Sequence, residues 1–591
     1  MGGERMKLPP GYFWLAAAAV VFVVFAASRL VTNDYFFFAG YVVLQYVVMA
    51  TAWNILGGYT GYVNFGTAGF YALGAYSTVV MHKLAAPPIA VSILVGGLVT
   101  GAVGLGMGYL TLRLRGIFFA IATLALAIVL ETVVANWNYV GGAKGVYTLR
   151  PALGPFGHNY IQYLFLVMLI LAALSVCIAR TIEHSKLGDG LATIRDDELA
   201  AEAAGVPTLK LKLIATTLSG ALMGMAGAPF PYYVIYLDPS SAFNLGFAVN
   251  SIAMPLIGGT SSWLGPVIGA VLLATIQQVA TVTISSALNL LIVGVIMVLF
   301  VVAAPNGIIG WFGRGGRTRR RVQWHRQLVP AQRPHPLTRP LEKGGMTDTL
   351  LRVEKLGKRF DGFIALDGID FDVAPGERIG LIGPNGSGKS TLVNCISGTL
   401  RNERGKVLFN GRRMDGLSAH TRTRLGLARS FQLPKPFHSM TVAENIHVPL
   451  LYTVNTWHGA CHLTNAEIET RVEEVLTQVG LNEKAGRRPR DLTQIEMRKL
   501  ELARAMAAAP KLLIADEAMA GLSNAEVDDI LNLLVKLSEQ GITVVLIEHI
   551  MRAVMSFSQR LVVLVAGRKL ADGAPQDVMR NPEVVRAYLG E

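Results

Sequence analysis

Cysteine is scarce in this sequence. Cys177, Cys395 and Cys461 are the only three in 591 residues, and they are scattered without the spacing of metal ligands. A disulfide framework normally needs an even number of closely set cysteines. The sequence therefore excludes a disulfide-stapled fold and indicates reduced thiols in a protein that faces the cytosol.

Charged residues are also scarce, and they are unevenly placed. They make up 16% of the chain against 52% hydrophobic residues, and nearly all of the long uncharged runs fall before residue 305. A chain of this length contains at least two domains, so the imbalance predicts a membrane half followed by a soluble half. Much of the net charge of +13 lies in one linker and beside the apolar runs, where lysine and arginine set membrane orientation. Its placement argues against nucleic-acid binding.

The first half offers ten apolar runs as membrane helices, because a bilayer core needs about 20 apolar residues per helix. Some runs are short or interrupted by glycine, so eight or nine spans remain alternatives. The first run is too long for a cleaved signal peptide and lacks a small-residue cleavage pattern. The ten runs are 12–30, 35–56, 65–81, 89–112, 117–137, 160–179, 213–235, 245–257, 266–283 and 288–304.

Basic segments give an independent test of orientation, because positively charged short loops stay in the cytoplasm. These segments are 5–7, 113–115, 180–212 and 314–321. With ten spans and the N-terminus inside, all four lie on the cytoplasmic side, where ATP is found. The stretch 138–159 is then the longest external loop.

The segment 180–212 interrupts the spans with about 30 polar residues, among them SKLGDGLATIRDDELAAEAAGVPT, whose apolar residues recur at helical spacing. We interpret it as short cytoplasmic helices on which an ATPase acts. A solvated loop is the alternative. Within the spans, Glu131 is either a functional carboxylate, as intramembrane charges usually are, or a residue of the outer membrane interface.

The membrane half resembles permeases of the bacterial branched-chain amino acid importer family. The glycine-rich signature NILGGYTGYVNFGTAGFYALGAY carries the closest resemblance, and three further blocks follow in the family's order. The blocks are 54–76, RLRGIFFAIATLAL from Arg113, IRDDELAAEAAGV from Ile194 and IGGTSSWLGPVIGA from Ile257.

One position departs from that family. The family often carries a glutamate five residues after the threonine that matches Thr123, where this chain has Ile128. Glu131 follows three residues later, on nearly the same helix face. We infer that the carboxylate has moved by one turn, which bears on the substrate preference.

Residues 312–347 separate the two halves. They contain the cluster RTRRRVQWHR followed by four prolines, a composition that cannot bury a core and forms an extended connector. The arginines either contact anionic lipid headgroups or keep a solvated tether inside the cell. Met346 opens MTDTLLRVEKLGKRF, which resembles the start of a free-standing ATPase and suggests that two genes were joined.

The second half contains a phosphate-binding loop. GPNGSGKST follows the strand-like run ERIGLI and precedes the helix-like TLVNCIS. Glycines let backbone amides turn toward phosphates, and the next helix adds its positive end. Lys389 then reaches the β and γ phosphates, and the Ser390 hydroxyl ligates Mg²⁺. The nucleotide-binding residues of this loop are Gly383, Pro384, Asn385, Gly386, Ser387, Gly388, Lys389, Ser390 and Thr391.

The second element is KLLIADE, an apolar strand that ends in adjacent carboxylates. Asp516 is suited to the magnesium shell. Glu517 is suited to polarise the attacking water, because a carboxylate just beyond the metal lies behind the γ phosphate.

These elements resemble the ATPase of ABC transporters over residues 348–591. The resemblance implies that Phe360 stacks on adenine, that Gln432 senses Mg²⁺ and contacts the permease, and that His549 contacts the γ phosphate as part of the catalytic set. LTQIEMRKLELARAM, from Leu492, occupies the signature position, and MAGLS, 519–523, fits the loop that crosses the ATPase dimer interface.

The ATPase half departs from its family at two places. Ala518 replaces the usual proline after the catalytic glutamate, and proline has no chemical role there. In the signature, Thr493 keeps a hydroxyl where serine is usual, but Ile495 replaces glycine.

The sequence thus predicts a polytopic all-α membrane domain over 1–311, a basic linker over 312–347, and an α/β P-loop ABC ATPase domain over 348–591. We expect an importer subunit in which hydrolysis of ATP, with Mg²⁺, drives inward transport of branched-chain amino acids or a related small organic solute. Its expected partners are a second permease, a second ABC ATPase, membrane lipids and a periplasmic or lipid-anchored substrate-binding protein. The expected location is the bacterial inner membrane, as a multi-pass protein with a cytoplasmic ATPase.

Two alternatives differ in class. An exporter half-transporter also joins a membrane domain to an ATPase, but usually has six long spans that extend into the cytoplasm. A soluble-type ATPase anchored to the membrane would not need ten spans. The substrate stays open, because similar permeases carry other amino acids, amides, urea and aromatic acids, and fold does not settle function.

Overall fold

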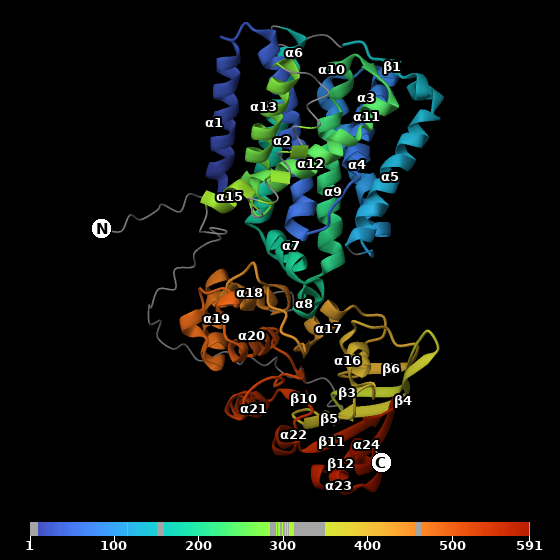
Figure 1. Ribbon diagram of the computed structural model, residues 1–591, viewed down its shortest axis with the longest axis vertical. Helices are drawn as coiled ribbons and strands as arrows, with labels where there is room; N and C mark the ends of the chain where they lie inside the picture. Colours follow the sequence, from blue (N-terminus) through green and yellow to red (C-terminus); the bar gives the residue numbers. More distant parts are fainter. Residues whose placement is uncertain are drawn as a thin grey trace, which may run out of the picture. The chain divides into compact units, whose positions relative to one another are not determined.

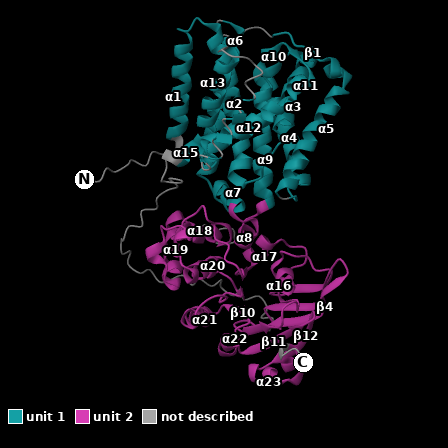
Figure 2. Cartoon of the chain, in the orientation of Figure 1, with its two compact units in different colours: residues 1–195, 209–324 teal, residues 196–208, 325–591 magenta. Residues whose placement is uncertain are grey.

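The computed structural model describes residues 10–114, 116–150, 159–283, 307–312, 349–454 and 463–589, with a few isolated positions between 291 and 304. The chain forms two compact units (Figure 2). One contains residues 1–195 and 209–324, and the other contains 196–208 and 325–591. The chain therefore leaves the first unit after Arg195, adds a short segment to the second unit, and returns at Leu209.

Several of the expectations fall outside the described residues. Among them are the linker over 312–347, except its first residue, the basic segments 5–7 and 314–321, most of the expected span 288–304, and Cys461. Cys177 and Cys395 are both buried as free thiols, as the spacing of the cysteines predicts.

The first unit is built from helices (Figure 1). α2 packs against α6, α12 and α13, and α3 packs against α4, α5 and α12. The helices are α1, Pro10–Ser28; α2, Asp34–Thr60; α3, Thr67–Ala85; α4, Ile89–Thr111; α5, Ile117–Ala135; α6, Tyr160–Glu183; α7, Lys186–Asp196; α9, Thr208–Gly227; α10, Phe230–Val234; α11, Pro239–Ala242; α12, Leu245–Gly258; α13, Leu264–Thr283; and α15, Gly307–Phe312.

Within the described residues, seven helices are long and apolar enough to cross a membrane. They are α2, α4, α5, α6, α9 continued by α10, α11 continued by α12, and α13. The expected span 12–30 forms a shorter apolar helix, Tyr12–Ser28, and the expected span 65–81 forms α3, which is not among the seven. The expected span 213–235 is not continuous, because the helix is interrupted between Gly227 and Phe230, where Pro229 lacks a backbone N–H.

Close helix packing in this unit depends on small residues, as is usual in membranes. A Cβ atom on Gly74 of α3 would lie 2.1 Å from the carbonyl oxygen of Gly224 in α9. Two short strands, β1, Val146–Tyr147, and β2, Tyr236–Leu237, pair antiparallel beside these helices. On α5, Glu131 is half-buried and Ile128 is exposed, so the two positions have different surroundings.

The polar segment after α6 is helical, as its periodicity predicts, and the solvated-loop alternative is wrong. α7 begins at Lys186, and α8, Glu198–Ala203, follows after the single residue Asp197. The Asp197 carboxylate caps α8 by accepting the N–H of Ala200 at 2.8 Å. α8 belongs to the second unit.

The second unit contains two sheets. The larger one has the order β12-β11-β5-β10-β9-β8, parallel except for β12, and the smaller, antiparallel one has the order β4-β3-β6-β7. The strands are β3, Leu351–Phe360; β4, Phe363–Val373; β5, Arg378–Ile382; β6, Arg404–Phe409; β7, Arg412–Arg413; β8, Leu427–Arg429; β9, Leu512–Asp516; β10, Thr543–Ile547; β11, Arg560–Val565; and β12, Arg568–Gly573.

Helices surround these sheets, and several begin with a capping box. Thr464 accepts the N–H of Glu467 at 3.3 Å while its own N–H donates to the Glu467 carboxylate at 2.6 Å. The helices are α16, Lys389–Ser397; α17, Ala419–Leu425; α18, Val442–Tyr452; α19, Asn465–Val479; α20, Gln494–Ala507; α21, Asn524–Glu539; α22, Met551–Phe557; α23, Pro575–Arg580; and α24, Pro582–Leu589.

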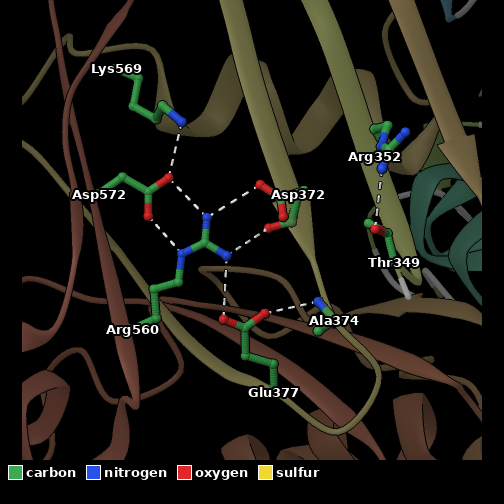
Figure 3. Close-up of polar contacts among 8 residues, drawn as sticks. All are labelled: Thr349, Arg352, Asp372, Ala374, Glu377, Arg560, Lys569 and Asp572. Atoms are coloured by element: carbon green, nitrogen blue, oxygen red, sulfur yellow. Dashed lines mark hydrogen bonds and ion pairs between the residues drawn. The ribbon is translucent and has the colours of Figure 1, made fainter. Parts of the chain in front are cut away.

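Arg560 joins the two sheets through three carboxylates (Figure 3). Its Nε lies 2.6 Å from an oxygen of Asp572, Nη1 lies 3.3 Å from Glu377, and Nη2 lies 3.3 Å from Asp372. Lys569 also pairs with Asp572 at 2.9 Å. Burial raises the pKa of Asp572, but the hydrogen bonds from Arg560 and Lys569 outweigh it, so the net pKa is below the ordinary value.

We predict that Arg560→Met destabilises the second unit by about 2 kcal/mol, because three carboxylates around a partly buried site lose their shared cation. Asp572 has a lowered folded-state pKa, so its contribution is present above the unfolded value of 3.8 and is lost as pH falls through the folded value. The difference from wild type should therefore be full at neutral pH and narrow only in strong acid. Thermal unfolding of the purified chain measures it.

Arg568→Met is the matched control. Arg568 is exposed and pairs with Asp367 at 2.7 Å, so its loss should cost less than about 1 kcal/mol. Equal stability of the two variants would contradict a central role for Arg560.

Candidate functional site

The phosphate-binding loop lies between β5 and α16. Gly386 and Gly388 adopt φ of 78° and 99°, a region that disfavours side chains. A Cβ atom on Gly388 would also lie 2.6 Å from the carbonyl oxygen of Ala365. Glycine is therefore required for this turn, which delivers the chain into the first residue of α16, Lys389.

Lys389 folds back over its own loop. Its Nζ donates to the carbonyl oxygen of Gly383 at 2.6 Å and to that of Pro384 at 3.0 Å. Burial lowers the pKa of Lys389, and the negative charges of Glu517 and Asp516 oppose that shift. The ammonium group is thus held beside the loop and the two carboxylates that the sequence singled out.

Strand register brings the loop and the carboxylates to one edge. β10 pairs with both β5 and β9, and Ile547 lies opposite Leu381 on one side and Asp516 on the other. Because parallel strands end at the same edge of the sheet, the residues that follow them emerge together. Glu517 and His549 therefore lie at the same edge as the phosphate-binding loop.

Asp516 forms a buried ion pair with Arg429, at the end of β8. Arg429 Nη2 lies 2.8 Å from the carboxylate, and the two side chains are 10% and 7% exposed. Nη1 of the same guanidinium donates to Asn394 of α16 at 2.5 Å. Arg429 thus links the strand of the expected metal ligand to the helix of the phosphate-binding loop.

Glu517 meets Gln432 across the site. The amide Nε2 of Gln432 donates to the Glu517 carboxylate at 2.6 Å. Glu517 has φ of 44°, an uncommon backbone conformation for a residue with a side chain. Such strain concentrates at active sites, so the geometry agrees with a catalytic glutamate at this position.

His549 follows β10, and its side chain is 66% exposed. Its neighbour Glu548 is 2% exposed, with one carboxylate oxygen accepting the N–H of Met519 at 2.8 Å and the other 3.8 Å from His549 Nδ1. Burial raises the pKa of Glu548. Glu548 therefore ties the 519–523 loop to the strand end that presents His549.

Arg498 makes a second tie of this kind. It lies buried in α20 and donates to the carbonyl oxygen of Gln432 and, at 3.1 Å, to that of Ala520. The signature helix is thus joined to the Gln432 segment and to the 519–523 loop within one chain.

Three further expected residues, Phe360, Thr493 and Ile495, lie at the end of β3 and the start of α20. Phe360 ends β3 with an exposed ring, and Lys358 Nζ lies 5.3 Å from that ring. At the start of α20, Thr493 is exposed and Ile495 is half-buried. Glu496 accepts the N–H of Thr493 at 2.9 Å, so this carboxylate caps its own helix.

Two aspartates hold the segment 196–208 to the rest of the second unit. Asp196 accepts the N–H of Ser439 at 2.8 Å, and Asp197 pairs with Lys435 at 2.8 Å. α8 also packs against α17. Lys435 lies three residues beyond Gln432, the residue that donates to Glu517, so this contact and the Glu517 site share one short segment of the chain.

Sequence reasoning did not single out Arg429, Arg498 or Glu548. A signal was present for two of them, because Arg429 precedes Gln432 in RSFQ and Glu548 precedes His549 in LIEH, both at ends of apolar strands. A buried charge at a strand end beside a motif residue suggests a supporting role.

Comparison with known proteins covers both units. The family model described as branched-chain amino acid transport system / permease component matches residues 35–301. The ABC transporter model matches 366–520, and the branched-chain amino acid ATP-binding cassette transporter model matches 568–591. The high-affinity branched-chain amino acid transport ATP-binding protein BraF of Pseudomonas aeruginosa is 38% identical over 254 residues, which is 42% of this chain and 100% of that protein.

The chain belongs to the branched-chain amino acid ABC transporter family. The transporter is also similar to the high-affinity branched-chain amino acid transport ATP-binding protein LivG of Escherichia coli K12, at 36% identity over 42% of this chain and 100% of that protein. A solved nucleotide-free ATP-binding cassette from an ABC transporter is 32% identical and covers 41% of this chain and 100% of that cassette, with a TM-score of 0.37.

The family match confirms the predicted fold class and function class. The transporter is a fused permease and ABC ATPase, a multi-pass membrane subunit of an importer that binds ATP and couples its hydrolysis to transport. Importers of this kind act with a substrate-binding protein and as ATPase dimers. The permease match also removes the exporter and anchored-ATPase alternatives.

We predict that Arg429→Met lowers the stability of the second unit by about 3 kcal/mol, because it leaves the Asp516 carboxylate buried without its partner. The same variant should lose ATP hydrolysis at the neighbouring site. Arg413→Met is the matched control, since Arg413 is exposed and pairs with Asp415 at 2.9 Å. Chemical denaturation monitored for both variants decides the point, and equal midpoints would contradict it.

Proposed function

We propose that the transporter carries leucine, isoleucine, valine or a related small organic solute into the bacterial cytoplasm. The supporting observation is that the membrane half and the end of the ATPase half separately match models named for branched-chain amino acid transport. We assign 1–311 to the permease, 312–347 to the linker and 348–591 to the ATPase. The proposed location is the inner membrane, with the ATPase in the cytoplasm.

The proposed chemistry of the ATPase follows from the edge of the larger sheet. Lys389 binds the β and γ phosphates, and the amides of the phosphate-binding loop support it. Glu517 orients and deprotonates the attacking water, His549 contacts the γ phosphate, and Phe360 stacks on adenine. These are the roles that their motifs and positions support.

The oxygen groups beside this loop suit a magnesium ion, which prefers oxygen ligands. Ser390, Gln432 and Asp516 supply a hydroxyl, an amide oxygen and a carboxylate, and they would hold the ion. When bound, Mg²⁺ neutralises charge that develops on the phosphates. The proposed partners are a second permease, a second ABC ATPase and a periplasmic or lipid-anchored binding protein.

Uptake by the complete complex tests the proposal. Vesicles that contain the purified complex and its binding protein should accumulate labelled leucine when ATP is supplied, and isoleucine and valine should compete whereas urea and benzoate should not. Lys389→Ala should abolish uptake and weaken ATP binding, because it removes a charge from a site built around phosphates. If urea competed and isoleucine and valine did not, the proposed substrate class would be wrong. An unchanged ATP affinity of the Lys389→Ala variant would contradict the assignment of Lys389.

The signature of this chain differs from the pattern that a tight nucleotide site needs. In the proposed ATPase dimer, the signature of one subunit faces the phosphate-binding loop of the other. Ile495 is bulky and apolar where glycine allows close backbone approach. Glu496 adds a negative charge, which Lys484 offsets at 2.5 Å. The composite site that uses this signature should therefore hydrolyse ATP slowly.

The opposite composite site uses Lys389, Asp516 and Glu517 of this chain. We predict that Glu517→Gln lowers hydrolysis by the assembled complex by roughly 100-fold or more, because a positioned base is lost. Ile495→Gly should not reduce hydrolysis. Steady-state ATPase assays on the complex measure both, and a Glu517→Gln complex that keeps most of its activity would show that the partner's site carries the turnover.

A further inference from the structure

Three charged side chains contact the glycine-rich segment 57–66, which consists of the last turn of α2 and the connection to α3. This segment, called the glycine-rich loop below, contains Gly58 and Tyr59 within α2 and Tyr62 beyond its end. Nη1 of Arg195 donates to the carbonyl oxygen of Gly58 at 3.2 Å. Burying charge in a membrane protein is expensive, so charges that converge on one loop call for an explanation.

Lys212 makes the most deeply buried of these contacts. It is 2% exposed, and its Nζ donates to the hydroxyl of Tyr62 at 3.0 Å and to the carbonyl oxygen of Leu112 at 3.2 Å. The ammonium nitrogen also lies 4.4 Å from the Tyr62 ring centroid, within cation–π distance. Lys212 thus fixes the loop to the end of α4 and to the start of α9.

Glu183 holds the loop from the other side. This last residue of α6 is buried, and its carboxylate accepts the hydroxyl of Tyr59 at 3.4 Å and the N–H of Trp263 at 2.6 Å. Trp263 belongs to the second glycine-rich block, which begins at Ile257. The loop is therefore held by the ends of α6, α7 and α9.

These three charges share a position in the chain. Arg195 is the last residue of the first unit before the chain enters the second unit, and Glu183 lies one short helix earlier. Lys212 is the fourth residue after the chain re-enters the first unit at Leu209. The residues between them, 196–208, are those that bond to Ser439 and Lys435 in the ATPase. Each place where the chain passes between units is thus tied to the same loop.

The loop also joins α2 to α3, two helices with different main neighbours. α2 packs mostly against α6, α12 and α13, and α3 packs mostly against α4 and α5, although α12 contacts both. A few residues at the end of a helix or in a loop that absorb a change in backbone dihedrals can shift the helices on either side of them. Force on this loop would therefore change the arrangement of the permease helices.

We propose that Glu183, Arg195 and Lys212 are positioning residues that transmit movement of the ATPase-bound segment to the glycine-rich loop 57–66. The proposal rests on the transport function above, and it adds the element of the permease that receives the movement. Neutral replacements should break the link while leaving ATP binding intact. Lys212→Arg should preserve it, because arginine keeps the charge and the donors.

Hydrogen–deuterium exchange on the complex with its partner subunits tests the link without knowledge of the solute. In the Glu517→Gln background, which holds ATP, nucleotide should change the exchange of amides 57–66 in the otherwise unaltered chain. Lys212→Met and Arg195→Met should lose this change and retain the ATP-dependent change at the phosphate-binding loop. Lys210→Met is the matched control, because Lys210 is exposed two residues away, and it should behave like the parent.

Tyr62→Phe provides a second variant if Lys212→Met fails to fold, since it removes only the hydroxyl that Lys212 contacts. In complexes without the Glu517 change, each link variant should lower leucine transported per ATP hydrolysed by about tenfold. The proposal would be overturned if nucleotide changed the exchange of amides 57–66 in these variants as much as in the parent. It would also be overturned if the variants lost the nucleotide-dependent change equally at 57–66 and at the phosphate-binding loop. Failure of the unaltered complex to transport leucine would refute only the substrate assignment, because the exchange measurement would still stand.

Discussion

Parallel pairing of β5, β9 and β10 is the constraint on which the ATPase site depends. The three strands bring the phosphate-binding loop, Glu517 and His549 to one edge although they are separated by up to 160 residues or so in the chain. Buried charges then hold the loops at that edge. Arg429 fixes Asp516 to α16, Glu548 fixes the 519–523 loop, and Arg498 joins the signature helix to both the Gln432 segment and that loop.

The sequence motifs do not predict these supporting charges. The motifs predict Lys389, Asp516 and Glu517 because their chemistry requires fixed spacing along the chain. Arg498 depends on which helices and loops meet in space, and no local spacing encodes that. Arg429 stands beside a motif residue, but its partners Asp516 and Asn394 are set by tertiary contacts. The same limit applies to Lys389, whose contact with its own loop carbonyls is a tertiary outcome rather than a property of the motif.

In the membrane half, hydropathy predicts most helices because a continuous apolar run is a local property. It does not predict the interruption between α9 and α10, since the run itself is unbroken in hydrophobicity and Pro229 decides the outcome. Nor does it predict the burial of Lys212, which composition would assign to a cytoplasmic surface. Three-dimensional contacts with Tyr62 and Leu112 determine that position.

The short segment 196–208 gives the fused chain one further property. Because the segment and the ATPase belong to one polypeptide, their contact is intramolecular, and covalent connection raises the effective concentration of each for the other. A contact made by two aspartates and one small helix can then be weak and still stay occupied. A permease and an ATPase on separate chains must meet at their cellular concentrations, whereas this chain always carries both, so the covalent connection helps to keep the contact occupied.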